Sequence, residues 1–307
     1  MTRFLTRRLL QAIPTVVLVT MLVFLMLHLT PGDPAQVLLG DQRSTPEMLE
    51  RVRADMGLDR PLVEQYLTYM GSVLGGDLGR SLITNIPVGE SILLRLPHTI
   101  ELTIAAMLLA MVLGIGLGVL AALRHNTVVD TAAMTLALIG ISMPVYWSSL
   151  LLIMLFSVGL GWFPPIGQGS LDRLVLPAFA LALVSAGALA RLVRSSMLEV
   201  LNQDYIVTAR SKGLAQRRVI AWHAVRNALI PVITILGLTF GNLLGGAVLT
   251  ETIFARLGIG AMYVEAVLQK DFTLVQGTTL FIALAYVVIN ITIDLIYLVI
   301  DPRIRYD

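Results

Sequence analysis

The chain has 307 residues, of which 56% are hydrophobic and only 14% are charged, and its formal net charge is +2. A soluble domain does not need so much apolar sequence, and this composition is typical of a polytopic membrane protein. The absence of cysteine excludes disulfides and thiolate metal sites.

Apolar windows recur along the chain. A helix needs about 20 apolar residues to cross the hydrocarbon core of a bilayer. Six windows fit, so we expect an all-α bundle of six transmembrane helices. They are Leu9–Leu29, Leu102–Leu123, Thr131–Val158, Leu174–Ala190, Ala228–Thr250 and Leu274–Ile300. The fourth window is short, and we expect Arg191 and Arg194 on its helical continuation to snorkel to the interface.

The first window follows Arg3, Arg7 and Arg8, as the apolar run of a signal peptide does. It is too long for a signal peptide and no A-x-A cleavage site follows it. We therefore expect an uncleaved anchor. The window ends in TPGDP, residues 30–34, where two prolines prevent the helix from continuing.

Residues 30–99 form the only sizeable segment expected on the outer side of the membrane. Ser44 and Glu47 have the spacing of a capping box for a helix that ends near Gly57, and Pro61 favours the start of a second helix. Two interpretations stay open. This segment is a small cap packed on the bundle, or a surface for a substrate-binding protein.

Pro144 interrupts the third window. A proline is tolerated at membrane depth where a neighbouring helix or a cavity satisfies the carbonyl that it frees. We therefore predict a break in the third transmembrane helix.

A basic loop, residues 191–228, joins the fourth and fifth windows. It holds seven Lys or Arg residues, and the positive-inside rule places such a loop in the cytosol, with both chain termini on the same side. Tyr205–Lys212 is predicted as a short amphipathic helix with Tyr205, Thr208 and Ala209 on one face, and Gly213 as a turn before a second helix. From these residues alone, the loop is either a docking element or a solvated loop that fixes orientation.

The run TARSKG, followed by HAVRNALIP, resembles the coupling loop of ABC importer permeases, in the form found in the dipeptide/oligopeptide/nickel family. The broad importer pattern has Glu six residues before the glycine, where this chain has Val207. The peptide-family variant also lacks that Glu, so the departure narrows the resemblance to this family. The N-terminal segment and the ending DPRIRYD resemble the same family. The resemblance implies ATPase coupling by Asp204, Tyr205, Thr208, Ala209, Arg210, Lys212, Gly213, Arg217 and Arg218.

The fifth window carries Gly237, Gly241 and Gly245 at four-residue spacing, with Asn242 beside them. Small residues at this spacing let helices approach closely. Two interpretations stay open: packing within one bundle, or a subunit interface or pore lining formed by these four residues.

The last window places Asn290 and Asp294 on one polar stripe. An acid inside a membrane helix is by default a candidate functional residue. Asp294 is less than two turns from the inner end, so structural hydrogen bonding is the alternative.

The resemblance further implies a single transmembrane domain over residues 1–307 in a bacterial or archaeal plasma membrane. The implied partners are a second homologous permease, two ATPase subunits, an extracytoplasmic substrate-binding protein and membrane lipid. No nucleic-acid partner is expected. The implied substrate is a di- or oligopeptide, while glutathione, nickel and other small solutes stay open.

No energy-converting chemistry is visible in the chain. It lacks a G-x-x-x-x-G-K-[ST] loop, a metal-ligand cluster and a credible Ser/His/Asp set. We expect no cofactor on this chain and ATP with Mg²⁺ on partner ATPase subunits, so the chain itself is not an enzyme. An ion-coupled secondary transporter is the alternative of another class, although it would usually show repeated halves and several intramembrane acids.

Overall fold

The computed structural model describes residues 2–29, 34–39, 45–55 and 57–300, and this part of the chain is built from helices and turns. The expected all-α class is confirmed. By contacts the chain divides into two compact units, residues 1–97 with 258–307, and residues 98–257. The helices are α1 (Thr2–Leu29), α2 (Pro34–Leu39), α3 (Pro46–Asp55), α4 (Leu62–Leu74), α5 (Val88–Leu123), α6 (Val128–Ser142), α7 (Val145–Leu152), η1 (Ile153–Gly159), α8 (Asp172–Leu201), α9 (Asp204–Ser211), α10 (Gln216–Arg218), η2 (Val219–Val225), α11 (Arg226–Ala228), α12 (Ile230–Ile253), α13 (Ile259–Leu268) and α14 (Phe272–Ile300).

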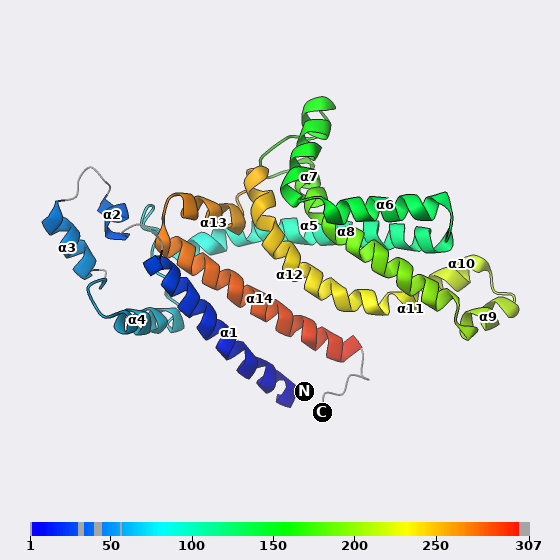
Figure 1. Ribbon diagram of the computed structural model, residues 1–307, viewed down its shortest axis with the longest axis horizontal. Helices are drawn as coiled ribbons and strands as arrows, with labels where there is room; N and C mark the ends of the chain where they lie inside the picture. The colour runs from blue at the N-terminus through cyan, green and yellow to red at the C-terminus, as the bar shows by residue number, and fades with distance from the viewer. Residues whose placement is uncertain (1, 30–33, 40–44, 56, 301–307) are drawn as a thin grey trace. The chain divides into compact units, whose positions relative to one another are not determined.

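In the first unit, α1 and α14 lie side by side (Figure 1). Helix α4 packs on α1 through polar and aromatic contacts. The hydroxyls of Thr20 and Tyr66 are 3.1 Å apart, and the ring of Phe24 meets that of Tyr66 edge-on at 5.4 Å. These contacts hold α4 against α1.

Asp271 organises the turn before α14. Its carboxylate accepts hydrogen bonds from the backbone N–H of Leu274 at 3.1 Å, as a helix cap, and from the N–H of Leu82, also at 3.1 Å. The hydroxyl of Ser81 donates to the same carboxylate at 2.5 Å. A single buried acid thus joins the loop after α4 to the start of α14.

Helices α3 and α4 have bounds close to those that the sequence predicts. Helix α4 starts directly after Pro61, and α3 ends at Asp55, two residues before Gly57. Ser44 and the TPGDP turn, up to residue 33, lie outside the described residues. At the start of α3 the hydroxyl of Thr45 accepts from the backbone N–H of Met48 at 3.3 Å.

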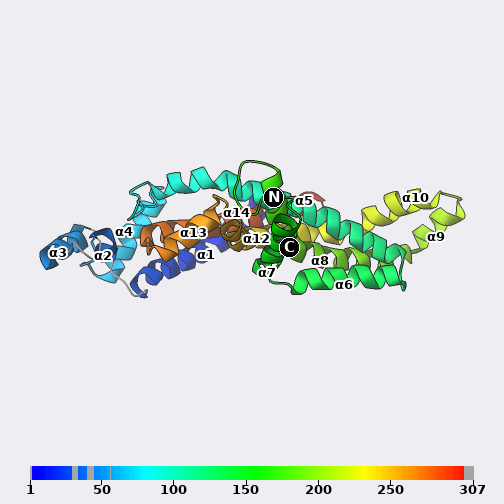
Figure 2. The same cartoon turned by 90° about the horizontal axis from the view of Figure 1, so that it is seen from above.

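In the second unit, α8 forms the core. It packs against α6 and α12, and Figure 2 shows α6 and α8 side by side. Glycines make these contacts close: a Cβ on Gly114 of α5 would lie 2.6 Å from Leu189 Cβ, and one on Gly118 would lie 2.6 Å from the Ala190 carbonyl oxygen. Gly187 faces the Ala137 carbonyl of α6 in the same way. Small residues therefore set the helix spacing in this unit.

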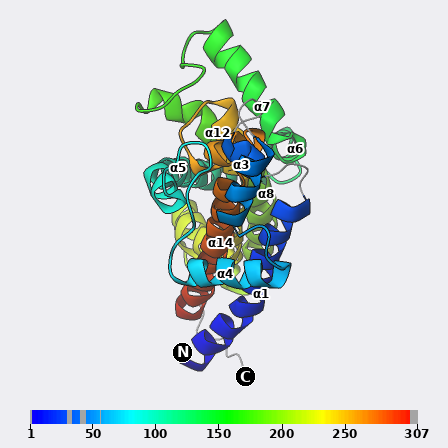
Figure 3. The same ribbon diagram turned by 90° about the vertical axis from the view of Figure 1, so that its left-hand side faces the viewer.

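The predicted break in the third window is confirmed. Helix α6 ends at Ser142, Pro144 caps the N-terminus of α7, and the two halves of the window are bent by 110° (Figure 3). Proline cannot donate a backbone hydrogen bond and disfavours a helical residue before it, so the helix restarts in a new direction.

Among the residues that the structure describes, three helices are long and apolar enough to cross a membrane: Val88–Leu123, Asp172–Leu201 and Phe272–Ile293. Five spans result if each of two bent pairs is one span, and Leu10–Leu25 is a shorter apolar helix. The chain is therefore a polytopic helical membrane protein, and the number six stays a prediction.

The structure adds two details to the window assignment. Helix α5 extends the second window toward the N-terminus, since it begins at Val88. The guanidinium of Arg194 binds the carboxylate of Asp130, and its snorkelling stays a prediction. The fourth window does continue through Arg191 to Leu201, as its predicted helical continuation requires.

Candidate functional site

Helix α8 extends into the basic loop and ends at Leu201. The amide of Asn202 donates to the Leu198 carbonyl at 2.9 Å, and the chain turns at Gln203 into α9. Asp204 lies in the first turn of α9 and Arg210 in its last. Both charges are favourable with the helix dipole, which supports a helix of only two turns.

Gly213 ends α9 in the way that its position predicts. Its φ is +75°, in the left-handed region that glycine adopts without strain. The N–H of Gly213 donates to the Arg210 carbonyl at 2.9 Å, and that of Leu214 to the Ala209 carbonyl at 3.4 Å. This pair of bonds forms a Schellman cap, and it fixes the direction in which the chain leaves α9.

One side of α9 is anchored in the core of its own chain. Ile206 is fully buried and Ala209 is 7% exposed, and both belong to the apolar cluster around α8. Ala209 therefore packs inward, whereas Tyr205 and Thr208 on the same predicted face are exposed, and the part of Ala209 in coupling stays a prediction. A short helix with small residues on several sides does not reveal from sequence which of them packs inward.

The rest of the surface of α9 is open. Val207 and Tyr205 are 54% and 41% exposed. The predicted coupling residues other than Ala209 are all exposed, namely Asp204, Tyr205, Thr208, Arg210, Lys212, Gly213, Arg217 and Arg218. The segment thus presents apolar and basic groups together on a helix that is held from behind.

The second half of the loop returns the chain to the membrane. Helix α10 continues into the π-helix η2 and then α11. The amide of Asn227 donates to the Tyr205 hydroxyl at 2.9 Å, so α11 and α9 are tied across the loop. Sequence reasoning missed this tie. The run HAVRNALIP marked the segment by resemblance, but no local pattern pairs two residues that lie so far apart.

A buried ion pair fixes the end of α8 that leads into the loop. Asp130 of α6 is 4% exposed, and Arg194 binds both of its oxygens, with Nε at 2.6 Å and an Nη at 2.7 Å. The backbone N–H of Asn126 and the ring of His125 contact the same carboxylate at 3.0 and 3.3 Å. A bidentate pair of this kind holds the α5–α6 turn to α8.

The glycines of the fifth window face different surroundings. Gly241 is buried, whereas Gly245 is exposed and a Cβ on it would meet no atom within 4 Å. The neighbouring Asn242 is also exposed, and Gly237 is half-buried. A Cβ on Gly246 would lie 2.9 Å from Leu181 of α8. Gly241 and Gly246 therefore contribute to packing within the chain, while Gly245 and Asn242 remain exposed on the surface.

The polar stripe of the last window lies on α14, where Asn290 is half-buried. The side chain of Asp294 lies outside the described residues. Within the described ranges, no group of three or more His, Cys, Asp or Glu side chains is placed to hold a metal ion.

The family is given by two sequence models. Residues 114–306 match the model described as binding-protein-dependent transport system inner membrane component, and residues 1–103 match the N-terminal model of the same system. The chain belongs to this family. Its members are membrane permeases and not enzymes, so the chain is a multi-pass protein of the bacterial inner membrane.

Full-length relatives have the same character. A Brucella abortus protein described as a peptide transport system permease protein is 46% identical, with 100% of both chains covered. The di/tripeptide transport system permease protein DppB of Pseudomonas aeruginosa is 44% identical, and the dipeptide transport system permease protein DppB of Escherichia coli is 41% identical. Each match covers 100% of this chain and 99% of the relative. The resemblance predicted from the sequence is confirmed.

A solved structure shares the fold. A chain from the crystal structure of an amino acid ABC transporter with histidines matches with a TM-score of 0.52 at 18% identity, over 70% of this chain and 95% of that chain. At this identity the likeness concerns the fold alone.

Proposed function

We propose that this chain is the permease subunit of an ABC importer for di- or oligopeptides and that it forms part of the translocation path. The observation that carries the proposal is the form of the basic loop. Helix α9 is anchored from behind by Ile206 and Ala209, tied sideways through Tyr205, and open on the face that carries Val207. Such an element can transmit a conformational change in a soluble partner to the helices that precede and follow it.

In the proposed assembly, the chain pairs with a second homologous permease, two ATPase subunits and an extracytoplasmic binding protein. Membrane lipid surrounds the two permeases. ATP and Mg²⁺ would bind to the ATPases. The chain acts as one transmembrane domain over residues 1–307, in which residues 30–99 face outward and the basic loop is the coupling loop. The names of the relatives, which are peptide and dipeptide permeases, support peptides over glutathione or nickel as substrate.

Uptake measurements test the substrate class directly. Cells that lack this gene should fail to accumulate a radiolabelled dipeptide, and the wild-type gene should restore uptake. Restored uptake of nickel or glutathione but not of any peptide would refute the peptide assignment. Uptake that persists when the ATPases are deleted, and that collapses with the proton gradient, would favour an ion-coupled transporter.

The proposed topology has six spans and both termini in the cytosol. The chain has no native cysteine, so single cysteines report cleanly on their own positions. A cysteine in place of the exposed Ser170 should react with a membrane-impermeant maleimide in intact cells. A cysteine in place of the exposed Gln216 should react only after the cells are permeabilised. Labelling of the Gln216 position in intact cells would overturn the helix assignment.

Gly245 tests whether the open part of the fifth window is an interface or a pore lining. Gly245→Leu should fit the isolated chain, because nothing lies within 4 Å of the added Cβ. In a close helix contact the same side chain would overpack by about 1–3 kcal/mol, so we expect about tenfold less second permease to co-purify, or a matching loss of transport.

Gly116→Leu is the matched control, because Gly116 of α5 also has no atom within 4 Å of an added Cβ. Gly241→Leu is a poorer probe, since Gly241 is buried in its own chain. Normal assembly and full transport by Gly245→Leu would restrict these glycines to packing within the subunit.

A further inference from the structure

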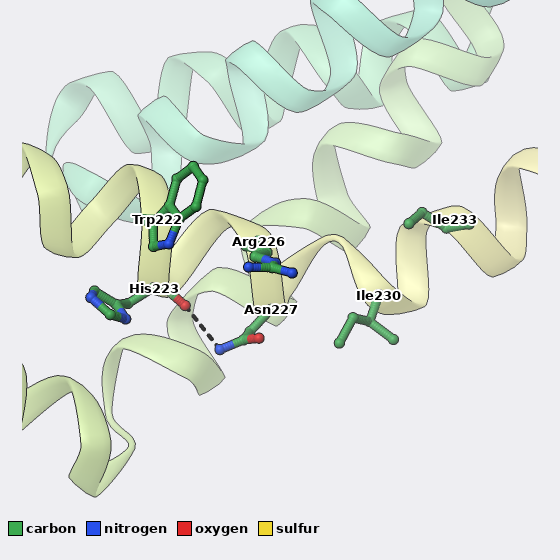
Figure 4. Close-up of a pocket in the computed structure, with 6 residues that line it drawn as sticks. All are labelled: Trp222, His223, Arg226, Asn227, Ile230 and Ile233. Carbon is green, nitrogen blue, oxygen red and sulfur yellow. Dashed lines mark hydrogen bonds between the residues drawn. The ribbon is translucent and has the colours of Figure 1, made fainter. Parts of the chain in front are cut away.

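A hollow lies on the helical segment that leads from the basic loop into the fifth window. Its volume is about 610 Å³, and it is lined by Trp222, His223, Arg226, Asn227, Ile230 and Ile233 (Figure 4). The segment is bent there by 41°, between Gln216–Ala228 and Ile230–Gly237. Pro231 lies just past the bend and cannot donate to the carbonyl of Asn227, which accounts for the change of direction.

One end of this hollow is cationic. The guanidinium of Arg226 lies 5.8 Å from the centre of the Trp222 ring. Within the described residues, no carboxylate is within ion-pair distance of Arg226, and none lines the hollow. The ring of His223 lies at the same end. An exposed cation backed by an aromatic face is a ready partner for an anion.

The other end is apolar. Ile230 and Ile233 are 52% and 37% exposed, and they lie on the first turns of α12. Figure 4 shows the polar side chains and Trp222 at one end of the segment, and the two isoleucines farther along it. The order of cation, aromatic ring and aliphatic groups along one helix is the order found across a membrane interface.

The residues that line the hollow favour one class of anionic ligand among peptides, soluble phosphate compounds and phospholipids. A peptide carries an ammonium group as well as a carboxylate, and the hollow offers no acid to the ammonium. A soluble phosphate compound would use the cationic end alone and leave the isoleucines in water. An anionic phospholipid uses both ends, with its phosphate on the basic residue and its acyl chain on the aliphatic ones.

We propose that this hollow binds an anionic phospholipid, with the phosphate on Arg226 beside Trp222 and an acyl chain along Ile230 and Ile233. The proposal rests on the cytoplasmic orientation proposed for the basic loop, which labelling at Gln216 tests independently. A bound lipid would hold the bend between η2 and α12, which is where the loop joins the membrane helix.

Native mass spectrometry of the full chain in detergent tests the site. Phosphatidylglycerol is titrated against the wild-type chain, Arg226→Gln and Trp222→Ala. We expect Arg226→Gln to bind this lipid about fivefold more weakly, which corresponds to about 1 kcal/mol for one basic residue at an anionic surface. Arg217→Gln is the matched control, because it removes an exposed charge from the same loop but outside the hollow.

The ligand classes separate in the same experiment. Phosphatidylcholine should bind more weakly than phosphatidylglycerol, and soluble glycerol phosphate should not compete. Equal loss with Arg226→Gln and Arg217→Gln, or equal binding of the two lipids, would overturn the proposal. So would a photo-crosslinking residue at Ile230 that captures a protein subunit and no lipid in native membranes.

Discussion

Asp130→Ala is expected to lower the free energy of unfolding by about 3–5 kcal/mol, the usual cost of removing one partner from a buried ion pair. Arg194 would lose both of its carboxylate contacts, at 2.6 and 2.7 Å, while three quarters of its side chain stays covered. The backbone N–H of Asn126 would lose its acceptor as well. Denaturant titration of the purified chain in detergent measures the loss.

A second substitution separates the cost of the unpaired Arg194 charge from the cost of the lost side-chain volume. The double variant Asp130→Ala with Arg194→Met should recover much of the stability, because an apolar replacement leaves no uncompensated charge. Glu64→Ala is the control for surface pairs, since Arg60 and Glu64 are exposed and 3.3 Å apart, and it should change stability by only a few tenths of a kcal/mol. Equal losses for Asp130→Ala and Glu64→Ala would contradict a stabilising role for the Asp130–Arg194 ion pair.

Local chemistry made several features predictable. Pro144 breaks its helix because it lacks an N–H, and Gly213 ends α9 because its φ of +75° suits glycine. Both effects depend on one residue and its immediate neighbours. The all-α class followed in the same way from apolar runs of helical length.

Features that depend on tertiary contacts could not be predicted. Arg194 has the properties of a snorkelling residue, and only the packing of α6 on α8 brings Asp130 to it. The apolar windows likewise do not give the start of α5, because its first turns carry charges and pack, through Val88 and Ile92, against Ile259 and Met262. The inward position of Ala209 has the same origin, since a two-turn helix presents small residues on more than one side.

The burial of Ala209 changes how the coupling role of the basic loop is tested. Ala209→Glu would place a charge in the core of the chain itself, so a lost activity would not distinguish docking from folding. Val207 is the better position, because its side chain is 54% exposed on the open face of α9. A lysine is the better substitution, because the broad importer pattern has glutamate there. It would not disturb the chain alone, and only a docked partner would bury it.

Val207→Lys and Gly213→Val are expected to abolish the stimulation of ATP hydrolysis by loaded binding protein in reconstituted complexes. A charge buried in the docked face costs on the order of 3 kcal/mol, which is about a hundredfold in docking affinity. A valine at Gly213 meets no atom within 4 Å, so its effect comes from the backbone alone, at about 1–3 kcal/mol for a φ of +75°. That strain would shift the direction in which the chain leaves α9.

Val207→Thr and Gly213→Asn are the matched controls, since threonine keeps the branched shape and asparagine tolerates a positive φ. The four variants should insert in the membrane and bind the binding protein equally, and only the first two should lose stimulation. Wild-type stimulation with Val207→Lys and Gly213→Val would refute the coupling role, because an element that transmits force between subunits must contact both of them.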